Sequence, residues 1–451
     1  MKKLLSIVLV LTLILSITAC GKNNNNTPSD ASVKPSESAD TSTGKDIEIR
    51  FTWWGDTKRH EVYNEICDRF EKANPGIKVI REPGSWADYW DKLATQSAGG
   101  NAPDVFGMHP QYVSDYAMRN TLADLQSYVD NGTIDISKMQ ESVVNSGKVN
   151  GNLLMISQGV TFTNLASNTT LAEQYGATLP AFNEDWTWDQ YAEKAKAFAD
   201  AVKAAGESGI YFSGDLMQQY NTFRYMARQA GGDLYTADGA LDFTEETVAK
   251  WFTFWNDLRT YGAVPDAATS SEDGSVALEQ KVFTLGKTVI TSIPANQLHL
   301  YQAQMADAKL GLLRNPVGNN NERGEYIEGA HFAVSNSIDD AHKEAAAKLI
   351  NFFVNTKESL EIFKMEQGVP ANTELGDFIK PLLDETMTLV IDYVNATMEV
   401  AGEGTYAPKG ATEIDTAFKE AAATVQFEQA TPEEAAKAFM AQAQSILDAN
   451  K

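Results

Sequence analysis

The hydrophobic pattern of the chain becomes regular at residues 46–56, DIEIRFTWWGD. Apolar residues at positions 47, 49, 51 and 53 alternate with polar ones, and this period of two predicts a strand with one better-buried face. The alternation breaks at Trp54, Gly55 and Asp56. We predict that Trp53 lies in the core and that Trp54 points to the opposite side at the strand end, where a crevice is expected. The alternative is that both tryptophans are core residues.

Helix and strand patterns alternate after this first strand. Residues 58–73 carry Val62, Ile66, Phe70 and Ala73 on one helical stripe, which the sequence NPG at 74–76 ends. Two more strands are predicted at 77–81 and 104–107, with a helix at 86–97 between them. Strands that alternate with helices imply right-handed crossovers. We therefore predict an α/β fold in which mostly parallel sheets are flanked by helices.

Later segments extend the same pattern. Thr187 and Gln190 have the spacing of a capping box at a helix start. Residues 248–258 form a strongly apolar helix with too many aromatic residues for one face, so most of them are expected in the core. Another strand is predicted at 288–292.

Length and charge narrow the class of protein. A chain of 451 residues favours two lobes over one domain, and 43% hydrophobic residues can fill both cores. The chain has 37 basic and 61 acidic residues and a net charge of −24, which argues against nucleic acid or an anionic membrane surface as a partner. Because long runs of like charge are absent from the sequence, the acidity is assigned to the folded surface.

The amino terminus carries an export pattern. Lys2 and Lys3 precede a short apolar run at 4–17, which predicts a secretory signal over residues 1–19 that is too short to be read as a spanning helix. The sequence ITAC at 17–20 resembles a bacterial lipobox, in which Cys20 becomes the lipid-modified first residue. Residues 20–45 are therefore expected to be this lipidated cysteine and a disordered tether, since residues 21–45 are polar. Cys67 is left without a disulfide partner and is expected to pack as a small hydrophobe.

Several segments, in order, resemble one family. FTWWGD at 51–56, FEKANPGIKV at 70–79 and AGGNAPDVF at 98–106 look like the first lobe of the extracellular solute-binding proteins of family 1. Later matching segments are KVNGNLLMISQG at 148–159, GGD at 231–233, EGAHFAVS at 328–335 and QGVP at 367–370. Members of this family are sugar-binding receptors of ATP-driven importers. The resemblance implies a two-lobed periplasmic-binding-protein-like fold.

The same resemblance implies three crossings between the lobes, so that each lobe is discontinuous in sequence. The first lobe is predicted to comprise residues 46–157 plus 331–368, and the second residues 158–330 plus 369–451. Hinge segments are expected at 157–160, 328–331 and 368–370.

The sequence contains no recognisable catalytic or metal-binding motif. Its five histidines are scattered, and neither H-E-x-x-H nor C-x-x-C occurs. There is no G-x-S-x-G elbow, and the sequence GKT at 286–288 lacks the first glycine of a phosphate loop, because Lys281 stands there. We expect no cofactor, no metal and no enzymatic activity. The alternative is a secreted glycoside hydrolase that uses two carboxylates, since 61 acidic residues permit many pairs.

Sugar binding needs flat apolar rings for the carbon faces of the sugar and short polar side chains for its hydroxyl groups. Loops near the expected cleft offer both kinds. The predicted ligand contacts follow strands, begin or follow helices, or flank crossings: Trp54, Asp56, Trp86, His109, Gln158, Tyr220, Gly232, Asp233, Asn296, Glu328, His331 and Tyr406. The resemblance places Tyr406 at a family position that is commonly aromatic.

For several of these residues a structural role is the alternative. Asp56 is equally suited to cap the helix that follows it. His109 precedes a proline and can shape a turn, and Trp86 shares a helical face with Trp90, which favours packing. Arg224 is expected in a surface salt bridge and not in the cleft.

Together with the resemblance, these features predict a lipoprotein that captures an oligosaccharide between its lobes by hinge closure. The family's role implies delivery of the sugar to the membrane permease of an ABC transporter. We expect a monomer that is anchored through Cys20 at the extracellular face of the cell membrane and does not bind nucleic acid.

Overall fold

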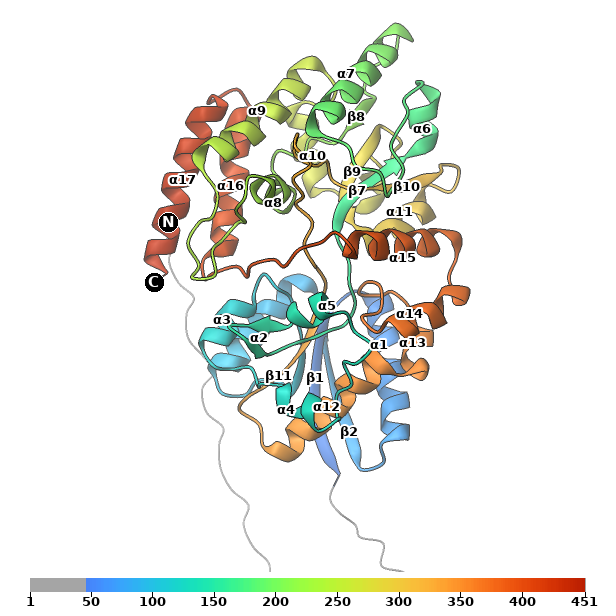
Figure 1. Ribbon diagram of the computed structural model, residues 1–451, viewed down its shortest axis with the longest axis vertical. Helices are drawn as coiled ribbons and strands as arrows, with labels where there is room; N and C mark the ends of the chain where they lie inside the picture. Colours follow the sequence, from blue (N-terminus) through green and yellow to red (C-terminus); the bar gives the residue numbers. More distant parts are fainter. Residues whose placement is uncertain (1–45, 451) are drawn as a thin grey trace, which may run out of the picture. The chain divides into compact units, whose positions relative to one another are not determined.

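Two main β-sheets organise the protein (Figure 1). The computed structural model describes residues 46–450. The predicted signal sequence, the lipidated Cys20 and the tether lie outside the described residues. Among the helices of residues 46–450, none combines the length and the apolar character needed to cross a membrane.

The first sheet has the strand order β2-β1-β3-β11-β6. Its strands are β1 (Ile47–Trp54), β2 (Ile77–Gly84), β3 (Val105–Met108), β11 (His331–Val334) and β6 (Ile156–Ser157). β2 and β3 run parallel to β1, whereas β11 is antiparallel to both β3 and β6. This sheet therefore combines the amino-terminal βαβ units with a strand from late in the sequence.

The second sheet has the order β10-β7-β9-β8. Its strands are β7 (Thr163–Asn168), β8 (Tyr211–Ser213), β9 (Thr288–Pro294) and β10 (Leu310–Leu313). Only the β8–β9 pair is parallel, and β7 is antiparallel to both β9 and β10. A separate hairpin joins β4 (Lys148–Val149) and β5 (Asn152–Leu153).

Each sheet has its own helices, and together they form the two lobes. The helices of the first lobe come from two parts of the chain. The early part supplies α1 (Thr57–Ala73), α2 (Trp86–Ala98), α3 (Val113–Met118), α4 (Gln126–Asp130) and α5 (Glu141–Asn145), and the later part supplies α12 (Asp340–Asn355), α13 (Lys357–Phe363) and α14 (Thr373–Ile379). The remaining elements are α6 (Thr169–Gln174), α7 (Trp188–Ala204), α8 (Tyr220–Gln229), α9 (Glu245–Tyr261), α10 (Ala267–Ser275), η1 (Leu278–Gln280), η2 (Ala295–Gln297), α11 (Leu298–Gln304), η3 (Lys380–Leu382), α15 (Glu385–Met398), α16 (Ala411–Gln426) and α17 (Pro432–Ala449).

The two-lobed α/β class predicted from the sequence is confirmed, but the expectation of mostly parallel sheets is wrong for the second sheet. Parallel pairs arise where a strand, a helix and a strand follow one another, as in β1-α1-β2-α2-β3. In the first sheet β11, where the chain re-enters the first lobe, runs in the opposite direction, since it is antiparallel to both β3 and β6.

The first strand separates its two tryptophans as its alternation predicts. Trp53 is 1% exposed and packs in one core cluster with Ile49 and Phe51, whereas Trp54 belongs to a different cluster on the opposite face of the sheet. Local sequence signals also hold elsewhere, since Thr187 and Gln190 form a complete capping box at α7. The predicted stripe of α1 is buried except at Ala73, which is exposed because it is the last residue of the helix.

Three segments that cross between the lobes, residues 157–161, 327–331 and 367–370, lie side by side; we call them the crossing segments. Val160 and Val369 exchange two backbone hydrogen bonds of 2.7 and 2.8 Å. The backbone N–H of Gln158 donates to Ala330 at 2.9 Å, and that of Thr161 donates to Glu328 at 3.1 Å. The exact lobe boundaries stay predictions, and α14, which follows the third crossing segment, packs against α13.

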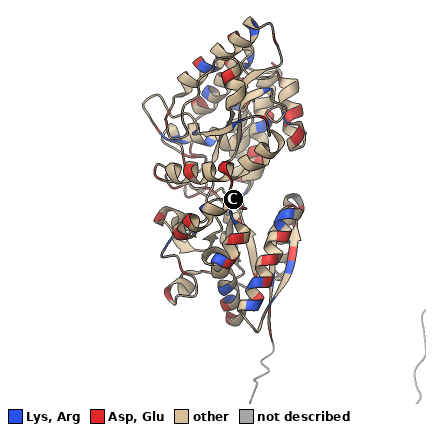
Figure 2. Cartoon of the chain, turned by 90° about the vertical axis from the view of Figure 1, so that its right-hand side faces the viewer, with Lys and Arg blue, Asp and Glu red and all other residues tan. Residues whose placement is uncertain are grey.

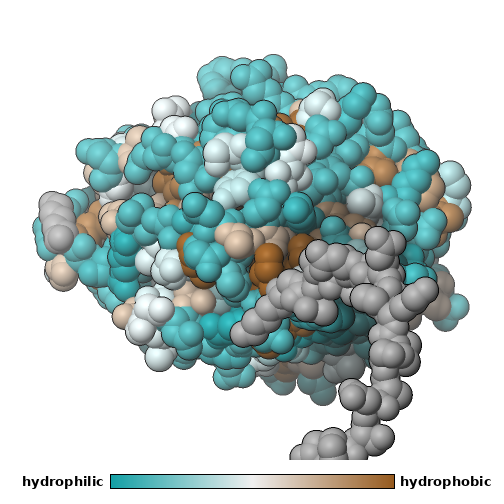
Figure 3. Space-filling view, turned by 90° about the horizontal axis from the view of Figure 1, so that it is seen from below, coloured by the Kyte–Doolittle hydropathy of each residue, from teal (hydrophilic) through white to brown (hydrophobic). Residues whose placement is uncertain are grey.

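Charged side chains of both signs lie over the surface of the described chain (Figure 2), as expected if its acidity belongs to the folded surface. Figure 2 shows acidic and basic residues interspersed over the described helices, with neither sign confined to one element. In the face drawn in Figure 3, hydrophilic residues cover most of the visible surface and hydrophobic ones form separate spots. The visible face therefore does not present one broad apolar patch (Figure 3), and the buried apolar residues lie in the core clusters.

Candidate functional site

A cavity of about 450 Å³ is lined by residues from both lobes. Its lining comes from six separate segments of the chain. These residues are His109, Pro110, Gln111, Ser142, Asn145, Ser146, Lys148, Gly151, Tyr220, Asn221, Arg224, Leu234, Tyr235, Tyr326, Ile327, Glu328, Gly329, Glu403, Gly404, Thr405, Tyr406, Ala407, Ala411 and Asp415. Cavities of this size are typical of small-molecule sites.

The ends of secondary structure elements place these side chains. His109 directly follows β3, so it lies beyond the carboxyl end of a strand in the first sheet. Tyr220 and Arg224 are both on the first turns of α8 and therefore share one helix face. Glu328 is in a crossing segment, just before β11. The lining is thus built at strand ends, at helix starts and at the crossings.

Residues 402–407, between α15 and α16, form an extended segment along the cavity, which we call the strap (Figure 1). The backbone N–H of Gly402 donates to Glu325 at 2.9 Å and fixes one end of the strap to the segment that precedes β11. Asn145 donates to Glu403 at 2.9 Å, and the Tyr406 hydroxyl donates to the carbonyl oxygen of Ser146 at 2.7 Å. The strap therefore connects the α5 region to the second lobe.

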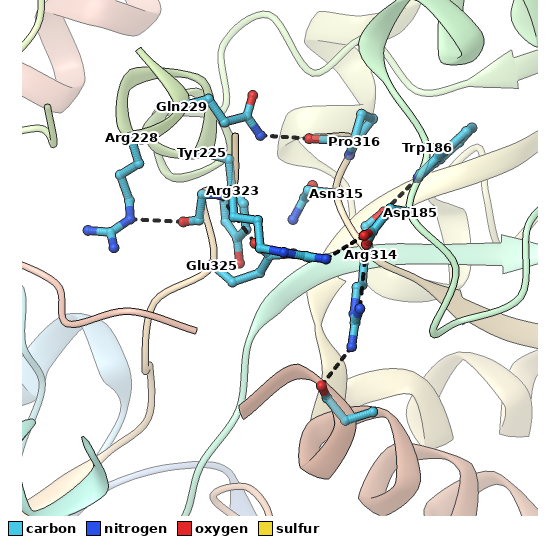
Figure 4. A network of polar contacts seen from close by, with 12 residues as sticks. Asp185, Trp186, Tyr225, Arg228, Gln229, Arg314, Asn315, Pro316, Arg323 and Glu325 are labelled. Carbon is cyan, nitrogen blue, oxygen red and sulfur yellow. Dashed lines mark hydrogen bonds and ion pairs between the residues drawn. The ribbon is translucent and has the colours of Figure 1, made fainter. Parts of the chain in front are cut away.

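A polar network holds residues 314–325, the segment that leads to the second crossing segment (Figure 4). Arg228 donates from Nε to the carbonyl oxygen of Gly324 at 2.9 Å, and Gln229 donates to that of Pro316 at 2.7 Å. Arg314, which is 5% exposed, donates to the carbonyl oxygen of Ala396 at 2.6 Å, and the Trp186 indole donates to Arg314 at 2.9 Å. These bonds satisfy the backbone of an irregular segment and so fix the position of its side chains.

Asp233 is the centre of a buried ion-pair cluster next to the cavity. It accepts from Arg224 at 2.5 and 2.9 Å and from Arg228 at 2.5 Å. The backbone N–H groups of Leu234 and Thr405 also donate to it, at 2.7 and 3.3 Å. Burial alone would raise the pKa of Asp233, but the hydrogen bonds and charges of the two arginines outweigh it and lower that pKa. Both carboxylate oxygens are thus fully used within the protein.

Arg224 lines the cavity but is not free. Besides Asp233, its guanidinium donates to the carbonyl oxygen of Thr405 at 2.9 Å and lies 3.8 Å from the centre of the Tyr326 ring. The expected salt bridge of Arg224 is therefore present, but its expected position at the surface is wrong. The Arg224 side chain is only 13% exposed and lines the cavity. The strap, through Thr405, covers the Arg224 side chain, and the sequence did not predict this contact.

Glu328 brings a carboxyl group to the cavity. Its oxygens accept from the backbone N–H of Thr163 at 3.0 Å and from the Thr163 hydroxyl at 2.9 Å. Burial raises the pKa of Glu328, while the bonds from Thr163 and the charge of Arg224 oppose this rise. The group is therefore a hydrogen-bond acceptor held in a fixed position.

His109 is a neutral donor. Its Nδ1 accepts the backbone N–H of Gln111 at 3.3 Å, which places the ring proton on Nε2. Burial lowers the pKa of His109 to about 4, so the imidazole stays uncharged at neutral pH.

His331 lies behind the cavity lining, where its Nε2 is 3.0 Å from the Ser146 hydroxyl. Burial and the neighbouring His109 lower the pKa of His331 to about 4. The unfolded chain takes up a proton near the usual pKa of about 6.5, but the folded chain does so only near the lower value. The stability present above the unfolded pKa is therefore lost as pH falls from that value through the folded one.

This linkage gives a testable pH dependence. Between pH 7 and pH 5, His331 is expected to cost the folded state about 2 kcal/mol. Urea unfolding of the wild type and of His331→Gln at both pH values measures it, because the variant should show the smaller pH dependence. His342→Gln is the matched control on the exposed start of α12. Equal pH dependence in the wild type and in His331→Gln would contradict the assignment.

Among the predicted ligand contacts, the structure brings His109, Tyr220, Glu328 and Tyr406 together in the cavity lining. Tyr235 and Tyr326 join them, so four tyrosines line one cavity. The hydroxyls of Tyr220 and Tyr235 are buried, and neither makes a hydrogen bond of good geometry inside the described chain. Burial raises the pKa of both groups, which keeps them as neutral phenols.

The other predicted contacts lie outside the lining, and their contact roles stay predictions. Asp56 caps α1, since the backbone N–H of Arg59 donates to it at 2.9 Å. Gln158 is 3% exposed and connects the Tyr63 hydroxyl to the carbonyl oxygen of His331, with bonds of 2.5 and 2.7 Å. Asn296, on η2, accepts from Thr161 at 3.1 Å.

The remaining predicted contacts lie in the loop after α8 and among the aromatic residues of the first lobe. Gly232 packs so tightly that an added Cβ would lie 1.9 Å from the carbonyl oxygen of Asp242, and it precedes the ion-paired Asp233. Trp54 is 6% exposed beneath Trp86, Tyr89 and Trp90, whereas Trp86 itself is 43% exposed.

Sequence reasoning missed several lining residues, among them Asn145, Lys148, Asn221, Glu403 and Asp415. All are ordinary polar residues on helices, on a loop or on the short strand β4, so nothing in their local pattern separates them from solvated surface. Two other missed lining residues had usable signals: Tyr326 lies two residues before a predicted crossing, and Tyr235 follows the GGD segment. In the described chain, no group of three or more His, Cys, Asp or Glu is arranged to hold a metal ion.

The fold and the cavity define a two-lobed ligand-binding protein. A family model described as bacterial extracellular solute-binding protein matches residues 65–388, which is most of the chain. The chain belongs to this family.

Similar proteins agree with this assignment. The maltooligosaccharide ABC transporter solute-binding lipoprotein of Streptococcus pneumoniae is 24% identical over 398 residues, which cover 84% of this chain and 82% of that protein. A solved structure of an extracellular solute-binding protein family 1 from Alicyclobacillus acidocaldarius is 27% identical, with a TM-score of 0.73 over 90% of this chain and 99% of that one. The Listeria monocytogenes ABC substrate-binding protein in complex with cycloalternan is 23% identical, with a TM-score of 0.73 over 89% and 99% of the two chains.

Proposed function

We propose that this protein is the receptor of a carbohydrate ABC importer, and that it captures an oligosaccharide in the cavity between its lobes. The family gives the class of binding protein. The relative from S. pneumoniae is named for maltooligosaccharides, and the L. monocytogenes structure contains cycloalternan, so both support a sugar as ligand.

The observation that carries the proposal is the chemistry of the cavity lining. Four tyrosines provide rings for the apolar faces of a sugar: Tyr220, Tyr235, Tyr326 and Tyr406. Asn145, Asn221, His109 and Glu328 provide fixed donors and acceptors for hydroxyl groups. This combination of ring faces and short polar groups suits a carbohydrate better than an apolar ligand.

The charges of the lining support an uncharged sugar. Glu328, Glu403 and Asp415 contribute three carboxyl groups, and Arg224 and Lys148 contribute two cations. Arg224 is already paired with Asp233, and the Lys148 ammonium donates to Asn145 at 2.9 Å. An acidic sugar would therefore meet more carboxylates than available cations, which disfavours its binding.

Capture is proposed to proceed by hinge closure. The crossing segments are the connections about which the lobes can rotate, and the lining residues come from both lobes. A ligand that contacts both lobes favours the closed state by its differential affinity for that state. The closed complex then delivers the sugar to the membrane permease.

We also propose that the mature protein is a monomer, tied through lipid at Cys20 to the extracellular face of the cell membrane. The lipobox-like sequence before Cys20 and the lipoprotein relative from S. pneumoniae support the anchor. Such an anchor would keep the receptor close to its permease.

Calorimetric titration tests the function. The protein without its signal sequence is titrated with neutral cello-, xylo-, malto- and manno-oligosaccharides and with oligogalacturonides. We expect stoichiometric binding of at least one neutral series and recovery of the intact sugar. Release of shorter products at catalytic rates would identify a glycoside hydrolase, and absence of binding to every series would refute the proposal.

Tyr406→Ala is expected to weaken sugar binding by more than tenfold, about 1.4 kcal/mol, because it removes a ring from the cavity. Tyr406→Phe keeps the ring and removes only the hydroxyl that donates to Ser146. Calorimetric titration of both variants therefore measures how much the ring and the hydroxyl of Tyr406 each contribute to sugar affinity. If Tyr406→Ala binds as tightly as the wild type, Tyr406 does not contact the sugar.

A further inference from the structure

Trp86 is exposed although it packs against a cluster of mostly buried aromatic side chains. It begins α2, and its side chain packs edge-on against Trp54, Trp90 and His109, with ring centres 5.2, 5.4 and 5.6 Å apart. Trp54 and Trp90 are 6% and 8% exposed, whereas Trp86 is 43% exposed. We call Trp54, Trp86, Trp90, His109 and Tyr112 the aromatic rim.

The aromatic rim holds Trp86 in a fixed place. Ser85 caps α2, and its hydroxyl donates to Asp88 at 2.6 Å, which secures the turn that carries Trp86. Trp90 stacks on Tyr112 with ring centres 3.9 Å apart. Beneath them Trp54 lies against Gly107, where an added Cβ would come within 2.8 Å of the Trp54 ring. An exposed ring with such support loses little conformational entropy when a ligand stacks on it.

The aromatic rim is continuous with the cavity. His109 belongs to the rim and also lines the cavity, and its neighbours Pro110 and Gln111 line it too. Trp86 is not part of that lining, so its ring lies outside the cavity and contacts one of its lining residues, His109. A ligand that extends past His109 reaches Trp86 next.

We propose that Trp86 forms an outer sugar-binding subsite, so that the protein prefers oligosaccharides long enough to extend from the cavity onto this ring. This inference rests on the proposed function and names the ligand class more narrowly, as a chain of several sugar units. A sugar ring is the occupant that fits, because a single supported tryptophan continuous with a polar cavity suits stacking on one pyranose. Protein docking sites are instead broad contiguous apolar patches.

The experiment compares chain lengths. Cello-, xylo-, malto- and manno-oligosaccharides from disaccharide to hexasaccharide are titrated into the wild type, Trp86→Ala and Trp86→Phe. For the series that binds, wild-type affinity should rise with length. Trp86→Ala should lower hexasaccharide affinity about tenfold, or about 1.4 kcal/mol, and disaccharide affinity less than about twofold. Trp86→Phe keeps a ring and should fall between the two proteins.

Tyr261→Ala is the matched control, because Tyr261 is an exposed ring, 47% exposed, at the end of α9 and outside the cavity lining. It should leave every affinity unchanged. An equal loss for all lengths in Trp86→Ala, no loss at any length, or wild-type affinity that does not rise with length would each overturn the outer subsite. In each of these outcomes the wild type still binds a sugar. Failure of the proposed function is different, because the wild type would then bind no oligosaccharide.

Discussion

Replacing Gly329 with alanine is expected to destabilise the folded protein by at least about 3 kcal/mol. Gly329 lies in the second crossing segment with φ of 147°, a conformation that side chains rarely allow. An added Cβ would lie 2.2 Å from the carbonyl oxygen of Gly159 in the first crossing segment. The obstacle is backbone and not a flexible side chain, so the segments would have to separate.

The third crossing segment meets the same point. A Cβ at Gly368, where φ is 115°, would lie 2.5 Å from the carbonyl oxygen of Val160. Three chain segments can therefore pack at one junction because the contact positions lack side chains. Since the proposed hinge is this junction, Gly329→Ala should also weaken sugar binding.

Urea unfolding of Gly329→Ala beside Gly376→Ala tests the argument. Gly376 is buried on α14, but a Cβ there would meet no atom within 4 Å outside its own helix and chain neighbours. That control should be neutral or more stable by up to about 1 kcal/mol, because alanine favours a helix. If the two variants have the same free energy of unfolding, close approach of the crossing segments does not require glycine.

The second large effect is expected for Asp233→Ala, which should cost about 3 to 5 kcal/mol in the absence of any sugar. The change leaves Arg224 and Arg228 without their shared carboxylate, with side chains only 13% and 15% exposed. It also removes the acceptor for the backbone of Thr405 and so loosens the strap. Asp233 is thus expected to act by positioning Arg224 and the strap.

Asp238→Ala, on the exposed turn that follows, is the matched control and should cost less than about 1 kcal/mol. Unfolding is measured without sugar, and affinity is measured by titration. A sugar-free stability equal to that of the wild type, with affinity alone reduced, would mean that Asp233 is a ligand contact and not a support.

The fold could be predicted well where local patterns decide. Alternation in the first strand separates Trp53 from Trp54, because successive side chains of a strand point to opposite faces. The capping box at Thr187 and Gln190 is equally local, since both partners lie within one turn. The two-lobed class came from the resemblance, which depends on the order of several such segments along the chain.

The candidate site could be predicted only in part. His109 and Glu328 were found because they directly follow a strand or lie in a predicted crossing, and Tyr406 was found through the family position. Asp56 and Asp233 have side chains suited to a ligand, but one oxygen of Asp56 accepts from the backbone of Arg59, and both oxygens of Asp233 accept from arginines. A sequence shows which groups exist and not which of them are already paired.

The sequence by itself determined the first strand, the first two helices to within about one residue, and the capping box at Thr187, because these depend on residue periodicity and on neighbours within a few residues. Only the tertiary structure decided that the second sheet is largely antiparallel, that the strap meets Ser146, and that Trp54 is covered while Trp86 stays exposed. These features depend on contacts between residues far apart in the chain. Packing and hydrogen-bond pairing at such distances are set by the arrangement of the lobes, which no local pattern contains.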